Sequence, residues 1–192
     1  MYKQCRTEQS AARQRILEQG LLEAMSQRHY DTISVSDLCA QMGIPRKSFY
    51  RYFSSKEGAL HALLDHALLD FESTSVAGFS MEEGVVYQNM VRMFQYWRSQ
   101  EKLLNALAKS GLSGMLAQRA IEHTVSEIGP MTSGLSGDER LYHVHAASFV
   151  ACGLFSMVVQ WHHSGYPQSP EQMARIAVRL VSRPLFSNGD KG

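Results

Sequence analysis

Hydrophobic side chains recur every three to four residues along nearly the whole chain, with polar residues between them. This spacing predicts amphipathic helices, and no run of alternating apolar and polar residues indicates a strand. Glycine and proline clusters interrupt the pattern and mark the connections. The sequence therefore predicts an all-α fold of about nine helices, at residues 8–28, 35–42, 46–52, 55–73, 81–99, 101–109, 113–128, 138–164 and 170–182.

The stretch from residue 34 to residue 60 carries the most specific local signals. Ser34 is a good helix N-cap, and Asp37 three residues later can complete a capping box. Gly43 suits the left-handed conformation that follows a helix, and Pro45 suits the first turn of a new one. Two short helices around a tight turn form a helix-turn-helix, whose second helix enters the major groove of DNA.

The second short helix combines an apolar anchor with a basic surface. Phe49 and Phe53 are four residues apart and are expected in the core rather than between bases. Arg46, Lys47 and Ser48 lie at the N-terminal end of this helix and are expected to reach base edges. An isolated basic helix could equally be a solvated face. Its position inside the motif favours the DNA-binding interpretation.

These segments resemble the DNA-binding domain of the TetR family of bacterial transcriptional regulators. The resemblance rests on the runs T-I-S-V-S-D-L-C, M-G-I, S-F-Y-R-Y-F and S-K-E-G-A-L, and it extends to about residue 65. Pro45 is a departure, since many members have Ser or Thr there, and the oxygen that would cap the helix is lost.

The resemblance implies that Tyr50 and Lys56 contact the DNA backbone. Lys56 would also stand at a helix N-terminus, where backbone N–H groups favour a phosphate. Tyr52 can donate a hydroxyl hydrogen bond to a phosphate oxygen, and Ser36 can reach a base or a phosphate. The residues expected at DNA are Ser36, Arg46, Lys47, Ser48, Tyr50, Arg51, Tyr52 and Lys56.

The expected domains are a DNA-binding domain at 1–55 and a ligand-binding and dimerisation domain at 56–184, followed by a frayed tail at 185–192. The helix at 55–73 runs from the first domain into the second, so it can convey motion between them. The resemblance implies a homodimeric repressor that binds palindromic operator DNA and is released by a small organic inducer.

In the TetR family the last two helices of each subunit form the dimer interface. The helix at 138–164 is apolar nearly all round, so burial on several sides is expected. Small residues at its centre would allow another helix to approach closely. The residues expected at the interface are Ala147, Ala151, Gly153, Phe155, Val158, Met173, Ile176 and Leu180.

Methionine and aromatic residues in the second domain are candidates for an inducer pocket, although at helical spacing they also simply fill cores. Trp97 and Tyr142 are the better candidates, because their polar tips need partners when buried. A neutral or weakly polar organic ligand is expected, bordered by the helices at 81–99, 113–128 and 138–164. The candidate residues are Met90, Met93, Phe94, Trp97, Met115, His123, Tyr142, His145 and Phe149.

Charge is unevenly distributed along the chain. Residues 1–56 hold nine Lys and Arg against five Asp and Glu, a net of +4, whereas residues 57–192 hold ten against thirteen, a net of −3. A basic head on a mildly acidic body fits a nucleic-acid-binding protein better than the total of +1 does.

Other classes of function find little support in the sequence. The three cysteines are far apart and are expected to be free, buried thiols in a reducing cytoplasm. No histidine pair has the spacing of a helical zinc site, and no cofactor motif occurs. The apolar run at 146–161 is shorter than the roughly 20 residues that span a bilayer. The alternative is a helical enzyme or protein-interaction module with an incidental helix-turn-helix, but no catalytic motif supports it.

Overall fold

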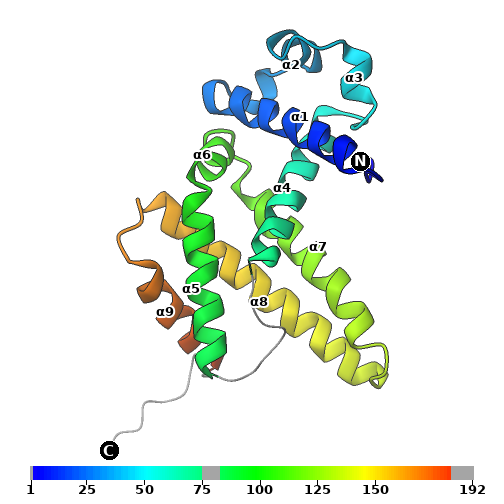
Figure 1. The fold of residues 1–192 in the computed structure, drawn as a ribbon. Coiled ribbons are helices and arrows are strands. Elements are labelled where there is room, and N and C mark those ends of the chain that lie inside the picture. Colours follow the sequence, from blue (N-terminus) through cyan, green and yellow to red (C-terminus); the bar gives the residue numbers. More distant parts are fainter. Residues whose placement is uncertain (1, 75–82, 183–192) are drawn as a thin grey trace, which may run out of the picture.

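The structure is a computed structural model that describes residues 2–74 and 83–182. In these residues the chain is all-α, which confirms the predicted class, and Figure 1 shows a small helical head above a larger helical body. The elements are α1 (Glu8–Gln27), η1 (Tyr30–Thr32), α2 (Val35–Gln41), α3 (Arg46–Tyr50), α4 (Lys56–Ser73), α5 (Glu83–Ser99), α6 (Glu101–Lys109), α7 (Ser113–Met131), α8 (Gly137–His163) and α9 (Pro170–Ser182).

Most predicted helices agree with the structure to within two residues, and one predicted break is wrong. Helix α7 does not end before Gly129 but continues through Pro130 to Met131. Pro130 has no N–H to donate to the Ser126 carbonyl oxygen, and the helix ends one residue later. The expected start of the fifth helix at 81 and the frayed tail lie outside the described residues.

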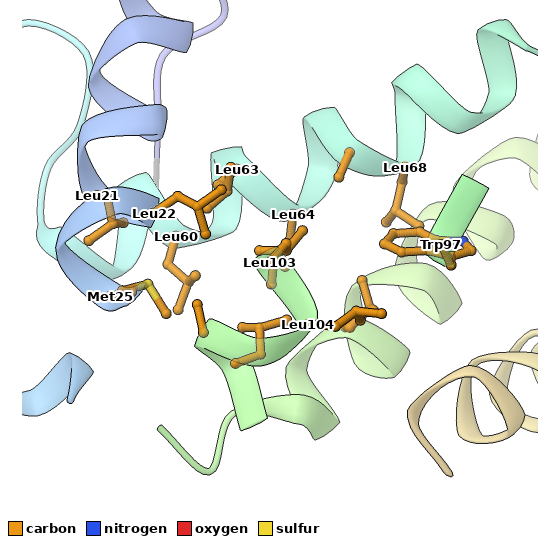
Figure 2. Close-up of a cluster of buried hydrophobic side chains, with 14 of the residues drawn as sticks. Leu21, Leu22, Met25, Leu60, Leu63, Leu64, Leu68, Trp97, Leu103 and Leu104 are labelled. Atoms are coloured by element: carbon orange, nitrogen blue, oxygen red, sulfur yellow. The ribbon is translucent and has the colours of Figure 1, made fainter. Parts of the chain in front are cut away.

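Helix α4 joins the head to the body through one continuous apolar face (Figure 2). Its N-terminal half presents Leu60 to Leu21 and Met25 of α1. Further along, Leu64 and other α4 leucines face the buried leucines of α6. Because the same helix supplies both cores, a tilt of α4 relative to the body must also move the head.

The body consists of two long helix pairs. Helix α5 lies along α9, and α7 lies along α8. Aromatic side chains fill the space where α5 meets α8: Trp97 stands edge-on to Phe155, with centroids 5.2 Å apart, and Phe94 stands edge-on to Trp161 at 5.5 Å. Trp97 and Phe94 are 0% exposed, so the core at this point is filled.

Candidate nucleic-acid interface

The turn between α2 and α3 has the geometry that the sequence predicts. Ser34 Oγ accepts from the Asp37 backbone N–H at 3.1 Å, and an Asp37 carboxylate oxygen accepts from the Ser34 N–H at 3.0 Å. The hydrogen bond from the Ser34 backbone lowers the pKa of Asp37. Gly43 has a φ of 64°, and Pro45 stands at the N-cap of α3 without a side-chain cap bond.

Helix α3 is held by its two phenylalanines. Phe49 and Phe53 are each 1% exposed, with ring centroids 5.2 Å apart, so both belong to the core as predicted. Arg46, Lys47 and Arg51 of the same segment are exposed. The recognition helix therefore buries its aromatic side and presents its cationic side to solvent.

Arg46 is oriented by Tyr50, one turn along α3. The guanidinium Nη2 donates to the Tyr50 hydroxyl at 3.4 Å, and the guanidinium carbon lies 5.8 Å from the ring centroid. This hydrogen bond raises the pKa of Arg46. Tyr50 is 46% exposed, so it can face a phosphate while it restrains Arg46. Ser48 is half-buried and Ser36, on α2, is exposed.

Two expected backbone-contact residues are arranged differently from the expectation. Tyr52 is only 6% exposed, because it follows the end of α3 and turns inward beside Phe53. The Lys56 ammonium donates to the Tyr30 carbonyl oxygen at 2.7 Å and lies 4.0 Å from the centre of the Tyr30 ring. Burial lowers the pKa of Lys56. Neither side chain is directed freely outward, although Lys56 does begin α4 as predicted.

The first residues of the chain form an arm that the sequence pattern did not indicate. Tyr2 makes an isolated antiparallel bridge with Phe53, and the Lys3 N–H donates to the Tyr52 carbonyl oxygen at 2.9 Å. The Tyr2 hydroxyl donates to Asp65 of α4 at 2.8 Å. Extended pairing between two segments fifty residues apart leaves no periodic signal in so short a stretch.

Helix α4 is tied to the head by two pairs of polar side chains. His66 Nδ1 lies 2.9 Å from Glu18 of α1, and Arg15 of α1 donates twice to Asp70 at 2.8 Å. Glu18 is fully buried, whereas Arg15 and Asp70 are more than one-third exposed. Neither pair leaves a signal in the sequence pattern, because its partners are 48 and 55 residues apart.

Helix α4 is also tied to the body by α7 and α5. Arg119 of α7 donates from Nε to Asp65 at 2.7 Å, and His123 Nε2 lies 2.7 Å from a Glu72 carboxylate oxygen. From α5, the Tyr96 hydroxyl donates to the Ala67 carbonyl oxygen at 2.7 Å. Asp65 accepts from both the N-terminal arm and α7, so it couples the head to the body at a single carboxylate.

Helix α6 makes a second connection between the body and the head. The Lys109 ammonium donates to the carbonyl oxygens of Ser26 and Gln27 at 3.1 and 2.8 Å, and so caps the C-terminus of α1. Lys102 pairs with Glu23, which lowers the pKa of that carboxyl. A shift of α6 would therefore pull on α1 directly.

The expected inducer residues divide into three environments. Met93, Phe94 and Trp97 are buried in the filled core of the body. Met90 and Met115 are partly buried against it. Trp97 Nε1 is a buried donor without a hydrogen-bond acceptor. His123 lies against Glu72 of α4 and lines neither of the two surface hollows.

Tyr142, His145 and Phe149 do not line an enclosed cavity, contrary to the expectation. Tyr142 is 71% and Phe149 is 70% exposed, and His145 is exposed as well. The helix pattern was correct, but a helix that is apolar on all sides does not indicate which side its own protomer covers. These three residues share the uncovered side of α8.

The expected interface residues also divide by side of the helix. Ala151, Phe155 and Val158 are buried within the protomer, as is Met173 of α9, so they do not face outward. Ala147 is half-buried, whereas Gly153 is exposed. Cys152, which was expected to be buried, is exposed on the same helix. Ile176 and Leu180 of α9 are 44% and 42% exposed. The outward side of α8 and α9 is thus open to a partner.

The described surface includes two hollows that bear on this question. One lies between α1 and α6 and is lined by polar residues that include Ser26, Lys102 and Asn105. The other has a volume of about 470 Å³ and lies between the C-terminal part of α8 and α9, where Trp161, Met173 and Ile176 line it. Neither hollow is lined by Trp97, which is 0% exposed in the filled core of the body.

By length and composition, helix α8 is long and apolar enough to cross a membrane. One such helix is weak evidence for a membrane span. Only 22% of its most apolar window is buried in the protomer. In residues 2–74 and 83–182, no group of three or more His, Cys, Asp or Glu side chains could hold a metal ion.

Both halves of the chain match models of known protein families. Residues 11–63 match the family model described as "Bacterial regulatory proteins, tetR family". Residues 86–183, more than half of the chain, match the model described as "Transcriptional regulator C-terminal region". No curated protein matches the chain significantly.

Solved structures show the same fold at low sequence identity. "Dihydroxyacetone kinase operon activator DhaS" is 18% identical, with a TM-score of 0.54 over 88% of this chain and 94% of its own. A tetR-family transcriptional regulator from Streptomyces coelicolor is 18% identical, with a TM-score of 0.55 over 90% and 79%. The fatty acid degradation regulator FadR from Bacillus halodurans is 14% identical, with a TM-score of 0.56 over 92% and 97%.

Proposed function

The chain belongs to the TetR family of bacterial regulatory proteins, and from that premise we propose that it is a ligand-responsive transcriptional repressor acting as a homodimer on palindromic operator DNA in the cytoplasm. The observation that carries the proposal is the recognition helix α3, which buries Phe49 and exposes Arg46 and Lys47. The proposal gives the chain no catalytic role.

On DNA, Arg46 and Lys47 are the base-reading candidates. Arginine or lysine donating to guanine O6 and N7 is the commonest specific contact in the major groove. Tyr50, Arg51 and the N-terminus of α4 would hold the phosphate backbone. The Lys56 ammonium already donates to the Tyr30 carbonyl oxygen. The backbone N–H groups at the start of α4 would therefore make the main contact with this phosphate.

Regulation would pass through α4 and α6. Two recognition helices must enter major grooves about 34–36 Å apart, or a multiple of that spacing. A ligand in the body that shifts α7 would act on α4 through Arg119 and Asp65, and a shift of α6 would act on α1 through Lys109. The ligand's effect is limited by the difference in its affinity for the two spacings.

The unpartnered Trp97 N–H supports an inducer site in the body. A buried donor without an acceptor is unfavourable, and a ligand carbonyl or hydroxyl oxygen could satisfy it. The surrounding residues Phe94 and Phe155 are apolar, so a neutral or weakly polar organic molecule fits this place better than a charged one. Binding would require the closed core to open.

The operator can be found in the DNA upstream of the protein's own gene by footprinting. We expect protection of a palindrome and an affinity that falls steeply with salt, since phosphate contacts release counterions. Arg46→Ala should weaken binding and relax base preference at one position per half-site. Arg140→Ala, which removes an exposed arginine from the start of α8, is the matched control. A flat salt dependence would contradict the proposal.

The direction of regulation needs its own measurement, since one structural neighbour is named as an activator. Transcription from the operator-bearing promoter should fall when purified protein is added to RNA polymerase. A rise in transcription, with operator binding intact, would retain the DNA-binding regulator and replace the repressor with an activator.

A further inference from the structure

Helix α8 carries an exposed stripe that its own protomer leaves uncovered. Tyr142 and Phe149 are 71% and 70% exposed, and Cys152, Gly153 and Ser156 continue the exposed positions. They recur three and four residues apart, so they lie on one side of the helix. Residues 141–170 contain no Asp, Glu, Lys or Arg, and the stripe therefore presents no formal charge that would repel a second copy of itself.

The hollow between α8 and α9 opens beside the same stripe. It is lined by the exposed Ser156 and Gln160, the half-buried Met157 and the buried Trp161. Its volume is about 470 Å³. An engineered apolar cavity of about 150 Å³ is enough to hold benzene, so this hollow has room for an aromatic ring. Its methionines can adjust to the shape of what enters.

Phe149 and Ser156, one of the residues that line the hollow, are placed symmetrically about the Cys152–Gly153 pair. Phe149 precedes Cys152 by three residues, and Ser156 follows Gly153 by three. A two-fold interface is self-complementary: when residue i contacts residue j, residue j also contacts residue i. Two antiparallel α8 helices that cross at Cys152–Gly153 would therefore place each Phe149 against Ser156 of the other copy.

Gly153 supports a crossing at this point. A Cβ atom built on Gly153 would meet no heavy atom within 4 Å, so packing inside the protomer does not require glycine. Glycine in a helix interior weakens the helix relative to alanine. Close approach by a second backbone gives this glycine a physical reason.

We infer that the second copy of this chain docks with its α8 antiparallel to the first, crossing at Cys152–Gly153, and that Phe149 of each copy fills the α8–α9 hollow of the other. The inference rests on the proposed homodimer and adds its register and its central anchor. The same register places His145 opposite Gln160 and Tyr142 opposite His163. The residues that had been expected in an inducer pocket thus become the centre of the interface.

Engineered disulfides test this register directly. In a chain with Cys5→Ser and Cys152→Ser, the pair Phe149→Cys and Ser156→Cys should give a covalent dimer on oxidation. The two cysteines are seven residues apart on one helix, about 10.5 Å along its axis. A disulfide requires Cα atoms about 4.4–6.8 Å apart, so the bond can form only between two chains. His143→Cys with Ser156→Cys is the matched control, because His143 is exposed on a different side of α8.

A second measurement concerns the anchor itself. Phe149→Ala should raise the dimer dissociation constant about tenfold or more, as expected for an aromatic residue in a central pocket. His143→Ala removes a neighbouring exposed ring on a different side of α8, and should change the constant less.

The outcomes separate the inference from the proposed function. A chain that is dimeric in sedimentation and binds its operator, yet forms no more covalent dimer with the 149–156 pair than with the 143–156 pair, overturns the register alone. A chain that is monomeric and does not bind a palindrome overturns both. Covalent dimer from the 149–156 pair only, together with a weakened Phe149→Ala dimer, supports the inference.

Discussion

His66 of α4 lies with its Nδ1 atom 2.9 Å from both carboxylate oxygens of Glu18 on α1. The Glu18 side chain is 1% exposed, and the edge of the Tyr2 ring lies against the His66 ring. The Arg15–Asp70 pair joins the same two helices in contact with solvent. The contact between α1 and α4 thus contains one buried pair and one exposed pair. The two pairs should contribute differently to the free energy of unfolding.

Replacing His66 with alanine leaves the buried Glu18 side chain without its hydrogen-bond partner. A buried polar group left unsatisfied costs about 1–3 kcal/mol, and more if it is charged. Asp70→Ala breaks the exposed pair, and such pairs contribute about 1 kcal/mol or less. Urea denaturation of the two variants should therefore show a larger loss for His66→Ala. Equal losses would mean that burial does not govern this contact.

Local elements could be predicted from the sequence because their causes are local. The Ser34 capping box, the Gly43 turn and the burial of Phe49 depend on neighbouring residues, and the structure confirms each. The partners of Glu18 could not be predicted, since His66 is forty-eight residues away. Tyr52 was misplaced because a tyrosine at a helix end fits a phosphate contact or a core position equally well.

The capping acids predict how stability depends on pH. Hydrogen bonds from Ser34 and Ser136 lower the pKa values of Asp37 and Glu139. A lowered folded-state pKa contributes stability above the unfolded values of about 3.9 and 4.3, and this stability is lost as pH falls through the folded-state pKa. The gap between the urea midpoints of the wild type and Asp37→Asn should thus shrink from pH 7 to pH 3. A gap that grows on acidification would contradict this sign.

Gly43 and Gly153 should respond oppositely to alanine. Gly43 has a φ of 64°, and an alanine held in the left-handed region costs roughly 1–2 kcal/mol. Gly153 is helical with open space around its Cβ position, so Gly153→Ala should stabilise the isolated protomer by up to about 1 kcal/mol. The same alanine should weaken the proposed dimer. Denaturation at low and high protein concentration separates the two effects.

The candidate sites were harder to predict than the helices because a site depends on which side of a helix is covered. Tyr142, Phe149 and Val158 all belong to one apolar helix, and periodicity alone groups them. The structure separates them: Val158 is 0% exposed, whereas the other two are open to solvent. Only the packing of α7 and α5 against α8 determines this division.

Trp97 and Trp161 can be compared directly, because both side chains are buried in the core of the body. Trp97 and Trp161 are 0% and 2% exposed, but only Trp161 has an acceptor for its N–H: the Gln168 carbonyl oxygen at 3.1 Å. Both Trp→Phe changes remove the same volume from a buried site. Trp161→Phe also removes the hydrogen bond to the Gln168 carbonyl oxygen, and a typical intramolecular hydrogen bond contributes about 0.5–1.5 kcal/mol.

We therefore expect Trp161→Phe to be more destabilising than Trp97→Phe by about 1 kcal/mol, measured as free energies of unfolding in urea. If the Trp97 N–H donates a hydrogen bond to the inducer, the Trp97→Phe variant should bind the operator with unchanged affinity. It should need a higher inducer concentration than the wild type to be released from the operator. Screening neutral organic compounds for release, first with the wild type and then with this variant, gives the comparison. An unchanged inducer response in Trp97→Phe would place the inducer elsewhere in the body, because the donor removed by the substitution would then have no role in binding.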